Sequence, residues 1–232
     1  MDQDLAKRRA GEEAARHVEH GMTIGLGTGS TTAFALAAIG RRILEEGLQV
    51  RGIPTSSSAE LEARKHGIPV CTFDDVQGKL DIAFDGADEV SPELDLIKGR
   101  GAAHTREKII ASQASRFMIL VDPSKLVKNL GTKVPVPIEI IPLAAPIILR
   151  TLQHMGARAS IRLGLRKDGP IVTDQGFWVI DAEFPPIDNP AGLSRELLDL
   201  PGVLDHGLFV GLATEVIVGT ESGVDVIQRP GS

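Results

Sequence analysis

Cysteine is almost absent from this chain, since Cys71 is the only one among 232 residues. A single cysteine cannot form an intrachain disulfide, so the expected location is the reducing cytoplasm. Cys71 ends an apolar stretch, Ile68-Pro69-Val70-Cys71, and this setting favours a buried strand thiol over a nucleophile. The chain is therefore expected to do its chemistry with other side chains.

Three further absences each exclude a class of protein. No apolar run approaches membrane-spanning length, and the N-terminal segment is charged throughout, so neither a transmembrane helix nor a signal peptide is predicted. The net charge is −6, which argues against nucleic acid or an anionic membrane as a partner. Apolar residues make up 42% and charged residues 24%, the mixture typical of a globular protein with a core.

Several catalytic signatures are also missing. No G-x-S-x-G elbow is present, which disfavours a Ser-His-Asp hydrolase. The six histidines are scattered and join no cysteine, so a transition-metal centre has no support. The loop Gly27–Thr32 is not followed by Gly-Lys-Ser/Thr, and Thr32 stands where a dinucleotide motif needs its third glycine.

What the chain does have is a regular alternation of strand-like and helix-like segments before residue 131. Strands are expected at 22–26, 48–53, 68–73, 81–84 and 117–121, and helices at 5–18, 33–44, 59–66 and 107–115. Strands that are apolar along their whole length, in β-α-β-α order, predict a Rossmann-like parallel sheet with helices on both faces of an α/β fold.

After Gly131 the pattern changes to β-α-β-β-α-β, the split arrangement of ferredoxin-like folds. We therefore predict an inserted smaller α+β domain at 131–209 within a catalytic domain at 1–130 and 210–232. Pro135 and Pro137 predict that the first strand of the insert is an edge or irregular strand. The predicted strands 215–218 and 223–227 should return to the first sheet. Three cations of this region are expected to be solvated surface charges: Lys133, Arg162 and Arg166.

Glycines and hydroxyls fill the loop between the first strand and its helix, as Gly27-Thr28-Gly29-Ser30-Thr31-Thr32. Glycines let a ligand approach the backbone, and the N–H groups and dipole of a helix N-terminus favour a phosphate. A small phosphate ester fits this loop better than a nucleotide. The alternative is a tight turn in which Ser or Thr caps the helix.

A second polar stretch runs from Asp81 to Lys108. Asp85 and Asp88 follow an apolar strand, Lys98 precedes Gly99-Arg100-Gly101, and Glu107 lies in a helix-like segment. Ligands of parallel sheets bind beyond the carboxyl ends of the strands, so the loops after successive strands should share one rim. This combination suits moving a proton beside a polarised oxygen. The alternatives are turn-capping aspartates, a surface glutamate at a helix start, or paired carboxylates that hold a metal such as magnesium.

Six motifs together resemble the type A ribose-5-phosphate isomerases: GLGTGSTT, SSS, DGADEV, IKGRGAAHTREK, VDPSKLVKNLG and VPVPIEIIP. They occur in this order and cover nearly the whole chain. The resemblance implies an aldose–ketose isomerase of the pentose phosphate pathway that interconverts D-ribose 5-phosphate and D-ribulose 5-phosphate without cofactor or metal. It also implies a homodimer or homotetramer in the cytoplasm.

The resemblance further implies the roles of individual residues. Glu107 matches the base that moves a proton between C2 and C1 through an enediolate, and partial burial would make it a better base. The matching substrate-binding residues are Thr28, Gly29, Ser30, Thr31, Asp85, Gly86, Ala87, Asp88, Lys98, Gly99, Arg100, Gly101 and Lys125. Some members carry glycine in place of Arg100.

Two assignments stay open at this level. Lys98 is the candidate for stabilising the enediolate and Lys125 for holding the substrate with the 28–31 loop, but these roles could be exchanged. Asp85 is a third catalytic candidate, since either it or Asp88 could assist ring opening. The rival functions are a non-catalytic sugar-phosphate sensor, which would need a DNA-binding module, and an amino-sugar-phosphate deaminase or isomerase, which should place histidine near its acids.

Overall fold

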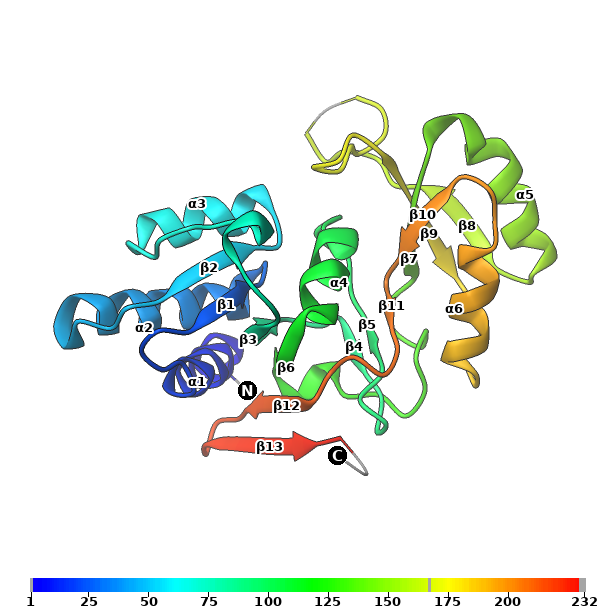
Figure 1. Cartoon of the computed structure of the whole chain (residues 1–232). Coiled ribbons are helices and arrows are strands. Elements are labelled where there is room, and N and C mark those ends of the chain that lie inside the picture. Colours follow the sequence, from blue (N-terminus) through cyan, green and yellow to red (C-terminus); the bar gives the residue numbers. More distant parts are fainter. Residues whose placement is uncertain (1, 167, 230–232) are drawn as a thin grey trace. The chain divides into compact units, whose positions relative to one another are not determined.

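The computed structural model describes residues 2–166 and 168–229. The described chain forms two compact units (Figure 1): unit 1 takes 2–87, 106–126 and 212–229, and unit 2 takes 88–105 and 127–211. The predicted insert at 131–209 lies within unit 2, which also contains residues 88–105. Residues 1 and 230–232 of the predicted first domain lie outside the described residues. The division into two folding domains stays a prediction.

Unit 1 is built on a six-stranded sheet in the order β13-β12-β6-β3-β1-β2. All neighbours pair in parallel except β12 and β13. The strands are β1 (Thr23–Leu26), β2 (Arg51–Pro54), β3 (Leu80–Asp85), β6 (Ala114–Val121), β12 (Glu215–Gly219) and β13 (Val224–Gln228). The helices are α1 (Gln3–Arg16), α2 (Ser30–Glu46), α3 (Ser57–Lys65) and α4 (His104–Ser112), which belongs to unit 1 from Arg106 on. The predicted Rossmann-like sheet is therefore confirmed, including the return of the two C-terminal strands.

Helices cover both faces of this sheet, as the apolar strands predict. Ile24, Leu26, Ile82 and Phe84 join alanines of α1 and α2 in one buried core. On the opposite face Gly25 has no side chain, and a Cβ there would come within 2.5 Å of Ile110 on α4. The glycine thus lets α4 pack closely on β1.

The expected strand at 68–73 is wrong. Only Val70 bridges to the sheet, through Gly52. Thr72 and Asp75 then form a capping box that starts the 3-10 turn Phe73–Asp75. This reciprocal side-chain capping competes with the extended backbone and ends the strand after one bridge.

Unit 2 contains a four-stranded antiparallel sheet in the order β10-β7-β9-β8, with two helices packed against it. The elements are β7 (Val136–Ile140), α5 (Ala145–His154), β8 (Arg158–Ile161), β9 (Trp178–Glu183), α6 (Pro190–Leu198) and β10 (Val203–His206). This is the predicted ferredoxin-like β-α-β-β-α-β order. A three-stranded sheet that the sequence did not predict joins β4 (Glu89–Val90), β5 (Leu96–Ile97) and β11 (Leu208–Phe209).

For the proline-containing strand, the edge alternative is wrong, because β7 pairs with both β10 and β9, whereas the irregular alternative agrees with a register shift in the pairing with β10 between Val203 and Asp205. Pairing beside β10 continues at Pro137, whose carbonyl accepts from the Gly207 N–H (2.7 Å). The Gly207 carbonyl accepts instead from the Lys98 N–H (2.9 Å), so the missing N–H of Pro137 leaves that acceptor satisfied and an internal strand tolerates the proline. In the described part of the chain, no helix has both the length and the apolar character needed to cross a membrane.

Candidate active site

Four predicted polar loops of unit 1 follow neighbouring parallel strands. They come after β2, β1, β3 and β6, which lie side by side in that order. The chain passes from β1 to β2 on one side and reaches β3 on the other, so β1 and β3 mark a switch point of the sheet. Loops diverge at such a point and leave a crevice outside the carboxyl ends of the strands, which is where α/β proteins bind ligands.

Contacts tie three of these loops, those after β1, β2 and β3, into one polar cluster. The Thr28 N–H donates to Asp85 Oδ1 (3.1 Å), and the Gly86 N–H donates to the same oxygen (2.8 Å). The Thr28 hydroxyl lies 2.8 Å from Thr55 Oγ1 and 2.6 Å from Ser56 Oγ. Asp85 is 1% exposed, so its carboxylate is fixed at the base of the cluster. The sequence pattern thus correctly brought Thr28, Asp85 and the serine loop together.

The glycine loop leads directly into α2. Gly29 is the N-cap residue with φ of 110°, a backbone conformation that favours glycine, and α2 begins at Ser30. Ser30 and Thr31 are therefore in the first turn, three residues earlier than the predicted helix start, and neither is buried. Their N–H groups have no acceptor within the helix, which is the geometry of an anion site. The Thr32 hydroxyl instead donates to the Gly29 carbonyl (2.8 Å) and stabilises the turn.

Glu107 lies in the first turn of α4 and is 5% exposed. This burial overturns the alternative of a solvated surface glutamate. Helix α4 precedes β6, which runs parallel to β3, so the helix N-terminus lies on the side of the sheet where β3 ends. Its neighbour Arg106 donates to the Pro54 carbonyl at the end of β2 (3.3 Å), which ties the start of α4 to the same edge.

Lys125 follows β6 and ends the 3-10 turn Pro123–Lys125. Asp122 caps that turn by accepting from the Ser124 N–H (2.8 Å), and it is 2% exposed. Lys125 is partly exposed, as a ligand-binding cation needs to be. Its place after the fourth of the neighbouring strands agrees with the predicted rim.

Ala87, partly buried, is the last residue of its segment in unit 1, and the other predicted residues belong to unit 2, where they form a second group. The Arg100 N–H donates to Asp88 Oδ2 (3.2 Å), and the Lys98 N–H donates to the Gly207 carbonyl (2.9 Å). Lys98 is 3% exposed, and its ammonium lies 5.4 Å from the centre of the Phe209 ring. Gly99 has φ of 105°, and a Cβ there would come within 2.7 Å of His104. Arg100 and Gly101 are exposed.

Sequence reasoning missed residues that support these groups. Glu89 of the DGADEV motif is fully buried, and its carboxylate accepts from the N–H groups of Gly131, Lys133 and Val134. Thr105, in the first turn of α4, donates to the buried Glu139 of β7. Only Glu139 had a signal in the sequence, because it is a charged residue inside the apolar run from Ile138 to Ile141. Among the described residues, no group of three or more His, Cys, Asp or Glu side chains is arranged to hold a metal.

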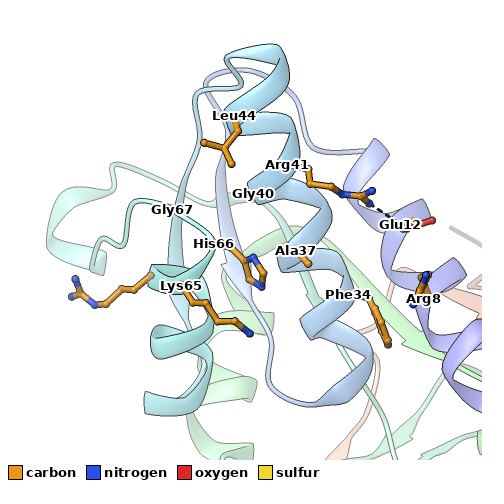
Figure 2. A pocket seen from close by; sticks show the side chains of 11 residues that line it. Arg8, Glu12, Phe34, Ala37, Gly40, Arg41, Leu44, Lys65, His66 and Gly67 are labelled. Carbon is orange, nitrogen blue, oxygen red and sulfur yellow. Dashed lines mark hydrogen bonds and ion pairs between the residues drawn. The ribbon is translucent and has the colours of Figure 1, made fainter.

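A separate groove of about 630 Å³ lies between α1, α2 and α3 of unit 1. Figure 2 shows Arg8 beside Phe34, and Arg41 paired with Glu12. Most of its other cations are also neutralised, since Arg64 and Lys65 pair with glutamates of α3. The groove contains none of the predicted site residues and has little net positive charge, so it is a poor site for a phosphate.

Cys71 gives a prediction of its own, since it is half-buried and lies outside any strand. Burial raises the pKa of its thiol, Asp75 adds to the rise, and Arg51 opposes it. The thiolate, which is the reactive form, should therefore be scarce at neutral pH. We expect iodoacetamide to alkylate the native protein more slowly than N-acetylcysteine, with the inflection of rate against pH shifted upward. Protein unfolded in urea should lose this shift, and a downward shift in the native protein would contradict the prediction.

The family model of ribose 5-phosphate isomerase A (phosphoriboisomerase A) matches residues 51–223. Ribose-5-phosphate isomerase A of Thermosynechococcus vestitus is 50% identical over 214 residues, 92% of this chain and 90% of the relative. The protein of the same name from Pyrococcus abyssi is 49% identical over 230 residues, 99% of this chain and 100% of the relative.

Solved structures show the same family similarity in three dimensions. Ribose 5-phosphate isomerase A of Methanocaldococcus jannaschii superposes with a TM-score of 0.92 at 47% identity, covering 96% of this chain and 98% of that one. A D-ribose-5-phosphate isomerase in complex with phospho-erythronic acid superposes with a TM-score of 0.96 at 46% identity, covering 99% of this chain and 100% of that one.

Proposed function

The chain belongs to the ribose-5-phosphate isomerase A family and interconverts ribose 5-phosphate and ribulose 5-phosphate, and we propose that Glu107 is the base of this reaction. The observation that carries the proposal is the position of Glu107. It is a buried carboxylate in the first turn of α4, the helix whose N-terminus lies at the carboxyl edge of the sheet. The family membership also sets aside the sensor and the deaminase as functions.

The chemistry explains why a held base is needed. The proton on C2 of the open-chain aldose is weakly acidic, and its removal places negative charge on the carbonyl oxygen of C1. A carboxylate in a fixed place removes it, and cations or hydrogen-bond donors stabilise the enediolate that forms. Glu107 then returns this proton to C1 while the C2 hydroxyl loses its proton and the C1 oxygen gains one, which yields the ketose. Base and proton carrier are the same group, so no further acid is required for the transfer between the two carbons.

We propose that the phosphate binds at the 28–31 loop. The first turn of α2 offers backbone N–H groups, and the hydroxyls of Ser30 and Thr31 add donors. Lys125, after the neighbouring strand β6, supplies the cation. The relative solved with phospho-erythronic acid supports a phosphorylated acid as a ligand of this fold.

The other predicted residues act on the sugar. Asp85 to Asp88 bind its hydroxyls, and Asp85 is the candidate for assisting ring opening. Lys98 stabilises the enediolate oxygen, and Gly99, Arg100 and Gly101 shape the loop that carries it. The conformation of Gly99, with φ of 105°, supports a turn that brings the backbone close to a ligand.

We further propose a cytoplasmic homodimer or homotetramer that needs neither metal nor cofactor and binds neither nucleic acid nor membrane. The acidic net charge of −6 supports the last two points. Light scattering after gel filtration measures the oligomer, and a single monomeric species would contradict it.

The experiment that tests the lysine roles is the isomerase assay, run with and without EDTA on Lys98→Met and Lys125→Met. Loss of a group that acts only on the enediolate lowers kcat, whereas loss of a phosphate-binding group chiefly raises KM. We expect Lys98→Met to lower kcat by about 10²-fold or more, as removal of an oxyanion stabiliser does. Lys125→Met should raise KM with a smaller change in kcat, and the reverse pattern would exchange the two roles.

Inhibition by EDTA would contradict the metal-free mechanism.

A further inference from the structure

Arg162 is not the solvated surface charge that the sequence suggested. It follows β8 in unit 2, and its side chain is only 15% exposed. Its guanidinium donates to Asp181 of β9 through two parallel bonds, Nε to Oδ2 (2.8 Å) and Nη2 to Oδ1 (2.5 Å). This two-bond pairing fixes the plane of the guanidinium as well as its position.

The remaining nitrogen of Arg162 reaches the loop that carries Lys98. Nη1 donates to the Gly99 carbonyl (2.9 Å) and to the Arg100 carbonyl (3.0 Å). One planar group therefore joins a carboxylate on the sheet to two consecutive carbonyls of a turn. A lysine has no such fork of donors and cannot satisfy both sides in this geometry.

The turn held in this way has an unusual backbone. Gly99 has φ of 105° and Ala102 has φ of 58°, which is uncommon for a residue with a side chain. Such conformations persist where surrounding contacts determine them. The Ala102 N–H donates to the Gly99 carbonyl (3.0 Å), so Arg162 and Ala102 share that acceptor.

We propose that Arg162, oriented by Asp181, is a positioning residue that fixes the Gly99–Arg100 turn and thereby places Lys98 for catalysis. This inference rests on the role proposed above for Lys98. The Lys98 N–H is already held by the Gly207 carbonyl on the N-terminal side of the turn. Arg162 holds the C-terminal side, so the backbone of Lys98 is fixed from both directions.

The control for Arg162 is Arg158 of β8, which also pairs with a carboxylate, Glu183 of β9 (2.5 Å). Its side chain is 89% exposed and, within the described part of the chain, makes no bond to the turn. We expect Arg162→Lys and Arg162→Gln to lower kcat by about 10- to 100-fold with KM changed less than about threefold, because small misplacements of a catalytic group are costly. Arg158→Lys and Arg158→Gln should keep the kcat of the unmodified protein. Equal kcat in the two pairs of variants would overturn the proposal.

A double-variant experiment shows whether Arg162 acts through Lys98. If it does, Arg162→Gln adds little further loss once Lys98→Met is present, since the placed group is gone. Losses that multiply would overturn the proposal. Should Lys98→Met alone retain full activity, the role proposed for Lys98 fails instead, so the two failures are distinguishable.

Circular dichroism and Tm check that each variant is folded. The kcat values are compared only well below the Tm of each variant. Asp181→Asn provides a milder change, because it keeps the size of the partner and removes its charge. We expect it to lower kcat several-fold in the same direction, and an unchanged kcat in a folded Asp181→Asn protein would count against the orienting role of Asp181.

Discussion

Replacing Glu107 with glutamine should reduce kcat by about 10³-fold, within the range that a general base contributes. The amide has nearly the size of the carboxylate and fits the same buried place, but it cannot accept the proton from C2. Affinity for the substrate should change little, because the predicted phosphate and hydroxyl contacts belong to other residues. Initial rates of ribulose 5-phosphate formation measure the first effect, and calorimetric titration with phospho-erythronic acid measures the second.

The matched control is Glu60→Gln, the same change in the first turn of α3. Glu60 is less buried and pairs with Arg64 (2.8 Å) at the surface, where such pairs contribute little. Its replacement should leave kcat within about twofold, as is usual for surface changes. Incubation in deuterium oxide adds a readout of the chemistry itself, since a base that carries the proton exchanges some of it with solvent. Near-normal turnover and deuterium incorporation in Glu107→Gln would refute the assignment of the base.

Gly27→Ala should damage both stability and activity. A Cβ at Gly27 would lie 2.3 Å from the Phe84 carbonyl and 2.7 Å from the Cα of Asp85, so the loop after β1 and the end of β3 would have to separate. Overpacking of this kind costs about 1–3 kcal/mol. Separation also lengthens the bond from the Thr28 N–H to Asp85, which joins the two loops at the switch point. We expect a lower Tm and a fall in kcat/KM of at least about tenfold, as follows from a misplacement near 1 Å.

Gly223→Ala is the control for the chemical change, because no atom lies within 4 Å of a Cβ there and its φ needs no glycine. Its Tm and kcat/KM should match those of the unmodified protein. If Gly27→Ala keeps both values as well, the loop after β1 is not packed on β3 as tightly as described. A loss of Tm alone, with kcat/KM preserved in the folded fraction, would show that the Thr28–Asp85 contact is structural only.

Local patterns were sufficient for most elements but not for their limits. The apolar strands and the β-α-β-α order predicted the parallel sheet, and the order after Gly131 predicted the ferredoxin-like arrangement. The strand expected at 68–73 failed because a capping box at Thr72 formed a 3-10 turn, which apolar content alone does not reveal. The edge alternative for the strand containing Pro137 failed because the acceptor opposite its missing N–H, the Gly207 carbonyl, receives the Lys98 N–H from another segment.

The residue types of the candidate site and their order follow from the linear pattern alone. Thr28, Asp85 and Lys125 follow successive parallel strands, and connectivity alone places strand ends of a parallel sheet on one edge. Which charged residues are buried depends on how distant segments pack in the folded chain. Glu107 and Arg162 carry ordinary charged side chains in the sequence, yet one is 5% exposed and the other is bound to two carbonyls of a distant turn. Burial and such long-range bonds arise from segments that meet only after folding, and for that reason no local pattern could reveal them.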